Sequence, residues 1–196
     1  MRACSRSSTI ISMYKKICIT NRHLVQGDFL RQIEKAAAAK PDALILREKD
    51  LSQEAYARLA VKVMAICREE GVPCFFNGWP ELAAELGAHG VQLPLKSAEA
   101  LEGEGLAKLP CFGVSVHSEE EAVKAEKIGA AFILYGHVFA TDCKKGVPPR
   151  GLDALARVCR CVSIPVFAIG GIHPQNAEQC IAAGAWGVGM MSEYME

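Results

Sequence analysis

The chain has 196 residues, 51% of them apolar and 22% charged, and its 22 Lys and Arg residues balance 22 Asp and Glu residues. This neutral balance argues against non-specific nucleic-acid binding and against attachment to an anionic membrane surface, because both need a basic excess. No run of about 18 apolar residues exists, so the sequence predicts no transmembrane helix. The nine cysteines never form a Cys-x-x-Cys pair, which indicates neither a zinc site nor a disulfide framework and suits a reducing cytoplasm.

The length predicts a single domain. Residues 1–12 contain two Arg and five Ser or Thr but no apolar core, so they do not form a signal peptide. We interpret them as a disordered leader, or as residues upstream of a true start at Met13. The single domain then covers residues 13–196.

From Tyr14 onward, short apolar runs alternate with longer segments of helical periodicity. The apolar runs predict strands near Lys15–Thr20, Ala43–Arg47, Pro73–Phe76, Gly90–Leu93, Cys111–Val116, Phe132–Tyr135, Pro165–Ile169 and Gly187–Met190. The segments between them predict helices over Phe29–Ala39, Gln53–Glu69, Pro80–Leu86, Ala98–Ala107, Glu119–Ile128, Leu152–Cys161 and Pro174–Ala183. Gly87, Gly129 and Gly184 follow three of these helices, where glycine suits the left-handed residue that ends a helix.

Strands that alternate with helices predict a parallel sheet, and strands that are apolar throughout indicate that both faces are covered. No Gly-x-Gly-x-x-Gly follows the first strand, which argues against a dinucleotide-binding fold. We therefore predict a (β/α)8 TIM barrel. Only Ser192–Glu196 follow the eighth strand, so the last helix is stunted or missing, and a second subunit in a homodimer is one way to cover the gap.

In such a barrel the active site lies at the C-terminal ends of the strands. The ends of the seventh and eighth strands both carry glycine, and their loops comprise Gly170, Gly171, Gly189, Met190, Met191 and Ser192. Backbone N–H groups in such loops bind a phosphate without a basic side chain. We favour a phosphate site there over glycines that serve tight turns only.

Cationic side chains follow the second strand. Arg47 and Lys49 share one face, and two inward cations suit a carboxylate or phosphate; the alternative is a solvated charge cluster. The loop after the sixth strand is long and polar enough to act as a lid or ligand clamp. Its candidate substrate contacts are Thr141, Cys143 and Lys144. No third group orients Cys143 as a nucleophile, so we interpret it as a packing or contact residue.

The end of the fifth strand carries a histidine. Strand alternation places Ser115 and His117 on one face, pointing inward. A histidine in that place suits general acid/base catalysis, because its pKa lies near neutrality. The alternative is a loop histidine that supports a capping box formed by Ser118 and Glu121.

Four stretches, in order and on the expected strands, resemble the thiamine phosphate synthase superfamily from about Tyr14 to Ser192. They are Leu46–Asp50, Gly113–Ser118, Gly136–Phe139 and Ala168–Ile172. The resemblance implies, for a synthase, the coupling of a pyrimidine pyrophosphate to a thiazole phosphate with Mg²⁺ held by two aspartates. Here Asn77-Gly78-Trp79 lacks the first aspartate and Ser97 takes the place of the second, which argues against a metal site.

These departures fit the sister family, the thiazole tautomerases (TenI-like), which are isomerases that aromatise a carboxythiazole phosphate tautomer in thiamine biosynthesis. Residues Gly136–Gly146 resemble the tautomerase version of that loop. The resemblance implies a reaction without metal or cofactor, in which His117 is the acid/base that moves the proton, and phosphate binding near Met191 and Ser192. Candidate partners of the ring carboxylate are Arg47, Lys49 and Lys144.

Three other interpretations stay open. The chain is a thiamine phosphate synthase with displaced metal ligands such as Glu48 or Asp50, or a non-catalytic regulatory protein that binds thiazole phosphate. The third alternative is an unrelated barrel that binds a phosphosugar, which requires the order of the four motifs to be coincidence. Fold and pocket alone do not separate these functions.

Overall fold

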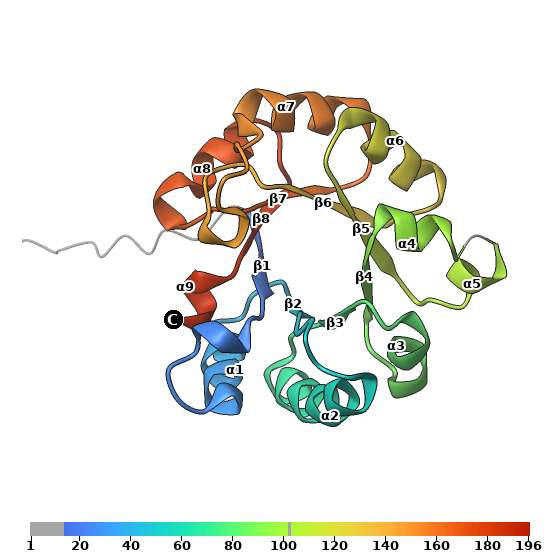
Figure 1. Ribbon diagram of the computed structural model, residues 1–196, viewed down its shortest axis with the longest axis vertical. Coiled ribbons are helices and arrows are strands. Elements are labelled where there is room, and N and C mark those ends of the chain that lie inside the picture. Colours follow the sequence, from blue (N-terminus) through green and yellow to red (C-terminus); the bar gives the residue numbers. More distant parts are fainter. Residues whose placement is uncertain (1–13, 102) are drawn as a thin grey trace, which may run out of the picture.

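The computed structural model describes residues 14–101 and 103–196, so the predicted leader, residues 1–12, lies outside the described residues. Eight parallel strands close into a barrel in chain order, with the first strand paired to the eighth (Figure 1). The predicted (β/α)8 TIM barrel is confirmed. Its strands are β1 Lys15–Ile19, β2 Ala43–Leu46, β3 Cys74–Asn77, β4 Gly90–Pro94, β5 Phe112–Val116, β6 Phe132–Gly136, β7 Val166–Ile169 and β8 Gly187–Met190.

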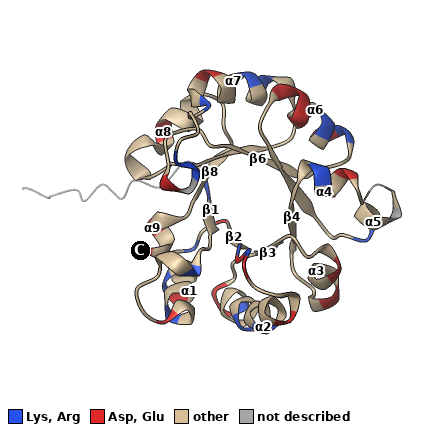
Figure 2. Cartoon of the chain, viewed as in Figure 1, with Lys and Arg blue, Asp and Glu red and all other residues tan. Residues whose placement is uncertain are grey.

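Helices surround the strands, and charged side chains of both signs are spread over them, whereas the strands are largely free of charge (Figure 2). The helices are α1 Phe29–Ala38, α2 Gln53–Glu70, α3 Pro80–Leu86, α4 Leu95–Glu99, α5 Glu104–Ala107, α6 Glu119–Lys127, α7 Gly151–Cys161, α8 Pro174–Ala182 and α9 Ser192–Met195. Two 3-10 turns, η1 Arg22–Leu24 and η2 Asp142–Lys144, lie in loops. Within the described residues, no helix is long and apolar enough to cross a membrane.

Most predicted elements agree with the structure, and one does not. The single helix predicted over Ala98–Ala107 is two short helices, α4 and α5. Gly103 has a φ of 76°, a left-handed conformation that interrupts a right-handed helix. Glycines end α3 and precede β6 and β8 as predicted, with left-handed φ values of 69° at Gly87, 88° at Gly129 and 103° at Gly184.

Three phenylalanine rings fill the interior of the barrel. The ring centroids of Phe75 and Phe132 are 5.6 Å apart, those of Phe132 and Phe167 are 5.9 Å apart, and both pairs are edge-to-face. Glycines on neighbouring strands make room for them. A Cβ atom on Gly113 would lie 2.2 Å from the Phe132 ring, and one on Gly90 would lie 2.7 Å from the Phe75 ring. The large aromatic rings thus occupy the space that glycines leave free on the neighbouring strands.

The other face of each strand packs against the helices, and the described cysteines belong largely to that core. Cys18, Cys67, Cys74 and Cys180 are buried free thiols, and Cys111, Cys159 and Cys161 are half-buried free thiols. Burial raises the pKa of the Cys180 thiol to about 11, so this thiol is neutral at physiological pH and acts as a small apolar side chain.

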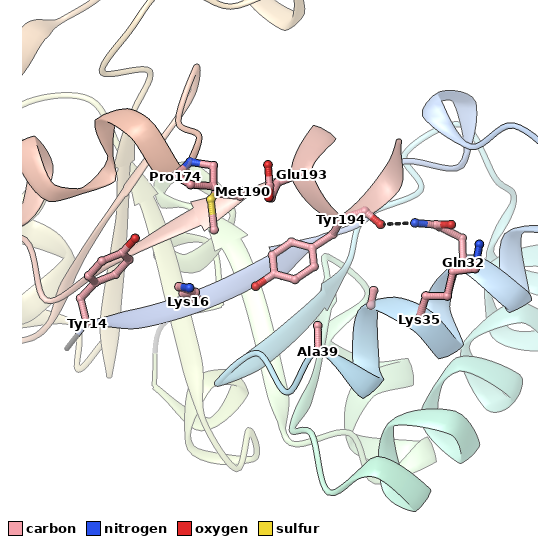
Figure 3. Close-up of a pocket in the computed structure, with 10 residues that line it drawn as sticks. Tyr14, Lys16, Gln32, Lys35, Ala39, Pro174, Met190, Glu193 and Tyr194 are labelled. Carbon is pink, nitrogen blue, oxygen red and sulfur yellow. Dashed lines mark hydrogen bonds between the residues drawn. The ribbon is translucent and has the colours of Figure 1, made fainter. Parts of the chain in front are cut away.

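The eighth helix is stunted as predicted, because α9 has only four residues. It lies between α8 and α1 (Figure 1) and is tied to α1 by Gln32, whose Nε2 donates to the Tyr194 carbonyl at 2.7 Å. A cavity of about 320 Å³ remains on this flank, with Lys16, Lys35 and Glu193 in its wall (Figure 3). The cavity occupies the part of the outer layer that a full-length helix covers in a complete barrel.

We expect Gly113→Ala to lower the free energy of unfolding by about 1–3 kcal/mol, because the added methyl group has no space beside the Phe132 ring. Gly105→Ala is the matched control. It adds the same methyl group in α5, where the nearest atom is 3.4 Å away, and should leave stability unchanged or slightly raised. Urea unfolding measures both variants, and equal stability of the two would contradict the packing argument.

Candidate active site at the mouth of the barrel

Strand alternation shows which side chains point into the C-terminal mouth. Ile45 and Phe75 belong to the interior core, so Arg47 and Asn77, two residues further along, return to the same face. Gly113 faces the interior beside Phe132, which places Ser115 and then His117 on that face as predicted. Arg47 and Ser115 are half-buried, whereas His117 is exposed.

Three cations gather at this mouth. Burial lowers the pKa of Lys49, and the positive charges of Arg47 and Lys144 lower it further. Arg47 and Lys49 follow β2, whereas Lys144 ends η2 in the loop after β6, on the opposite side of the eight-stranded barrel. The positive charge of Lys144 nevertheless acts on Lys49. The predicted cations are therefore near enough to interact electrostatically.

A buried carboxylate positions the segment that carries two of these cations. Glu48 is 2% exposed, and its Oε1 accepts a hydrogen bond from the Thr20 hydroxyl at 2.7 Å. The same Thr20 oxygen accepts the backbone N–H of Arg47 at 2.9 Å. One threonine thus fixes the backbone of Arg47 and the carboxylate that follows it.

Arg22, which lies in η1, also binds Glu48, and Thr20, Arg22 and Glu48 together form a clamp. The backbone N–H of Arg22 lies 3.1 Å from both carboxylate oxygens of Glu48, and its Nη1 donates to Glu48 Oε2 at 3.1 Å. The guanidinium also makes a two-point ion pair with Asp50. Hydrogen bonds from Arg22 hold the pKa of Asp50 well below its usual range. Both carboxylates of this segment are therefore engaged by the protein itself.

Hydrogen bonds join a row of three polar side chains around the mouth, those of Asn77, Gln92 and Ser115. Asn77 donates from Nδ2 to the Oε1 of Gln92, and the Gln92 Nε2 donates to the Ser115 hydroxyl oxygen at 2.5 Å. Gln92 is 3% exposed, and its Nε2 also donates to the Leu93 carbonyl at 3.1 Å. This row holds Ser115 in a defined orientation. The local sequence pattern does not show that Asn77 and Gln92 bond to each other, because they belong to different strands.

His117 is held by two contacts. Its Nδ1 lies 2.8 Å from the Gly136 carbonyl oxygen, and a carbonyl only accepts, so Nδ1 carries the proton and Nε2 is left for a ligand. Its backbone N–H donates to Glu121 Oε2 at 2.6 Å, while Glu121 N donates to the Ser118 hydroxyl oxygen at 3.2 Å. The predicted capping box is therefore shifted by one residue on its carboxylate side, which ties the backbone of His117 to α6.

The two glycines after β7 allow close contact with the loop after β6. A Cβ atom on Gly170 would lie 2.2 Å from His137 Cβ, and one on Gly171 would lie 2.3 Å from the Ala140 carbonyl oxygen. Both residues have positive φ, 91° and 65°. Backbone bonds join the loops, since Phe139 N donates to the Gly170 carbonyl at 3.1 Å. These glycines therefore serve loop packing, and the predicted phosphate contact stays a prediction.

The end of β8 lies next to the end of β7. The register pairs Ile169 with Gly189, and a Cβ atom on Gly189 would lie 2.9 Å from the Ile169 side chain, so this glycine faces inward. The Met190 side chain points the other way, into the outer cavity beside α9 (Figure 3), which leaves only its backbone for a ligand at the mouth. Met191 is half-buried and Ser192 is exposed.

The remaining predicted contacts lie in the loop after β6. Thr141 is half-buried just before η2, and Lys144 ends that turn in an exposed position. Cys143 lies within η2, but its side chain lies outside the described residues. Lys145 next to it pairs with Asp142 at 3.5 Å on the surface, so the two adjacent lysines have different surroundings.

The donor groups at the mouth do not fit a magnesium site of two carboxylates. Gly78 and Ser97, at the positions where the resemblance places aspartates, carry no carboxylate, and Ser97 is exposed in α4. Glu48 and Asp50 are engaged by Arg22. Among residues 14–101 and 103–196, no three His, Cys, Asp or Glu side chains are arranged to hold a metal ion. Mg²⁺ prefers carboxylate and other hard oxygen ligands, and the two carboxylates that follow β2, Glu48 and Asp50, are already bonded to Arg22.

We expect Thr20→Val, which preserves shape but removes the hydroxyl, to cost about 1–3 kcal/mol of unfolding free energy. The reason is that the buried Glu48 carboxylate and the Arg47 N–H each lose a partner. Thr20→Ser keeps the hydroxyl and serves as the control. Chemical denaturation compares the three proteins, and a stability of Thr20→Val equal to that of the wild type would show that the clamp contributes nothing.

Comparison with known proteins places the chain in a family. A family model described as thiamine monophosphate synthase matches residues 17–194. The chain is 34% identical to a thiamine-phosphate synthase of Syntrophomonas wolfei over 191 residues, 94% of this chain and 90% of that protein. It is 38% identical to one of Methanocella arvoryzae over 164 residues, 81% and 76% of the two chains. The structure of thiamine phosphate pyrophosphorylase from Pyrococcus furiosus aligns with a TM-score of 0.78 at 29% identity, covering 91% of this chain and 86% of that one.

These names correct the predicted reaction class. The prediction of an isomerase is wrong, because the relatives are named thiamine-phosphate synthase, which is a transferase. That prediction depended on two absent aspartates and on the resemblance of Gly136–Gly146 to the tautomerase loop, and the absence of the aspartates concerns metal binding rather than the class of reaction. The superfamily indicated by the four motifs is confirmed, and the chain belongs to the thiamine monophosphate synthase family.

Proposed function

We propose that this chain is a transferase that makes thiamine phosphate by coupling a pyrimidine pyrophosphate to a thiazole phosphate at the mouth of the barrel. The observation that carries the proposal is the set of three cations, Arg47, Lys49 and Lys144, around one opening. The coupling forms one carbon–nitrogen bond and releases pyrophosphate, so negative charge grows on the leaving oxygen. Fixed cations that face this charge stabilise the transition state.

The thiazole phosphate would bind at the ends of β7 and β8, the strands that follow β6 around the barrel. Support comes from the adjacency of these strand ends and from the chemistry of such loops, whose backbone N–H groups bind anions. The proposed contacts are the backbone groups of Gly170, Gly171, Gly189, Met190, Met191 and Ser192. In this proposal the phosphate of one substrate and the pyrophosphate of the other bind at separate places in the mouth.

The other predicted contact residues, Ser115, Thr141 and Cys143, lie beside the proposed substrate site. Ser115 offers a hydroxyl oriented by Gln92, and Thr141 and Cys143 lie in the loop that brings Lys144 to the opening. The closure of that loop over bound substrates would exclude water from the reacting atoms. We further propose a homodimer that covers the cavity beside α9, and a cytoplasmic location.

His117 has a different role in the coupling reaction than in the predicted tautomerase reaction. Coupling exchanges a carbon–oxygen bond for a carbon–nitrogen bond and needs no proton removed from carbon, so the acid/base role no longer follows. The Nδ1 contact with Gly136 leaves Nε2 available at the opening. We propose that His117 binds substrate through Nε2.

A second candidate function has one observation in its favour. Glu48 and Asp50 are engaged by Arg22, and the described residues contain no group of three side chains that could hold a metal ion, so the chain is alternatively a non-catalytic protein that binds thiazole phosphate. Turnover separates the two functions. A binding protein is stabilised by thiazole phosphate but forms no thiamine phosphate when both substrates are present.

We expect Lys144→Ala to lower kcat for thiamine phosphate formation on the order of 100-fold, because a cation that faces the leaving group is lost. Lys145→Ala is the matched control, since this neighbouring lysine is 80% exposed and pairs only with Asp142 among the described residues. It should change kcat less than about twofold. Product formation is followed by chromatography, and equal losses in the two variants would contradict the assigned role of Lys144.

We expect His117→Ala to raise KM about tenfold and to change kcat less than about threefold, as expected when a binding contact is lost. The pH profile of kcat should keep its shape, because His117 moves no proton in the coupling. Steady-state kinetics from pH 6 to pH 9 test this. A loss of kcat of about 100-fold with a changed pH profile would instead restore an acid/base role for His117.

A further inference from the structure

We infer that the mouth binds the pyrophosphate group as a bare anion, with Arg47, Lys49 and Lys144 supplying the positive charge and no divalent metal ion taking part. This inference rests on the proposed function, since it concerns the pyrophosphate subsite of the same reaction. Two independent features of the mouth carry it. One is where the carboxylates are, and the other is which charges surround Lys49.

The first feature is the placement of the carboxylates. A metal ion that bridges protein and pyrophosphate needs at least one carboxylate that points at the ligand. Glu48 is nearly fully buried and bonded to Thr20 and Arg22, and Asp50 is paired with Arg22 and His23. Releasing Glu48 for a metal ion would leave the Arg22 backbone N–H and the Thr20 hydroxyl without their partner. That cost opposes metal binding at this place.

The second feature is the charge at the opening. Both charges that act on the pKa of Lys49 are positive, and Gly78 carries no carboxylate where the family resemblance places an aspartate. Within residues 14–101 and 103–196, none of the three cations forms a salt bridge, and such cations favour a ligand with several negative charges and repel a divalent cation. A magnesium complex of pyrophosphate carries less negative charge than the bare anion. The mouth should therefore prefer the bare anion, and excess Mg²⁺ should weaken binding.

Side-chain geometry agrees with this role. Arg47 is half-buried with its backbone fixed by Thr20, so its guanidinium begins from a defined position and suits two-point contact with phosphate oxygens. Lys49 and Lys144 are exposed on long chains from opposite sides of the barrel. They can close on an anion between them, which places the charge around the ligand without a metal ion as a bridge.

Calorimetric titration of inorganic pyrophosphate into the full chain tests this inference, once with EDTA and once with excess Mg²⁺. We expect binding in EDTA that weakens several-fold in Mg²⁺. Lys49→Ala and Lys144→Ala should each weaken the binding in EDTA about tenfold or more. Lys145→Ala should match the wild type, because it keeps all three cations of the subsite.

The outcomes separate this inference from the proposed function. Pyrophosphate binding that appears only with Mg²⁺ would overturn metal-free recognition, whether or not thiamine phosphate is formed. Equal losses in Lys144→Ala and Lys145→Ala would also overturn it, since the binding would then reflect general surface charge. Binding in EDTA that depends on Lys49 and Lys144, together with no coupling in any buffer, would support the inference and reject the transferase function.

Discussion

The packing of the barrel interior is the constraint on which the rest of the structure depends. Phe75, Phe132 and Phe167 meet edge-to-face on the axis, and this is possible because Gly90 and Gly113 leave room on the neighbouring strands. With the lower interior filled by apolar rings, polar side chains can face the axis only above them, at the C-terminal ends of the strands. The same alternation that seals the interior therefore produces a polar mouth directly above it.

Charge at that mouth is arranged by a clamp below the surface. Thr20 and Arg22 on one strand end bind Glu48 on the next, so the carboxylates of this segment are used to hold the protein together. In the described part of the chain, Arg47 and Lys49 beside them form no salt bridge of their own, which leaves their charge for a ligand. A site that loses a carboxylate loses one negative charge, so its net charge becomes more positive. A more positive site prefers the bare phosphate ligand to its magnesium complex.

Membership in a family and the details of a site answer different questions. The order of four motifs along the barrel identified the superfamily, whereas the loss of two aspartates suggested a different reaction, and the named relatives contradict that step. Loss of ligands is evidence about the metal, because Mg²⁺ depends on carboxylates. It is not evidence about which bonds are made, since cations can stabilise a leaving pyrophosphate by other means.

The sequence by itself determined the alternation of strands and helices, the short last helix and the inward face of β5, because periodicity and glycine positions are local properties. It also placed Arg47 and Lys49 together, since they are two residues apart. Only the tertiary structure showed that Lys144 reaches them from the opposite strand, that Glu48 is bonded to Thr20 and Arg22, and that Met190 faces away from the mouth. The interactions of Glu48 and Lys144 join residues 26 to 95 positions apart, and barrel closure, which no local pattern encodes, brings them together.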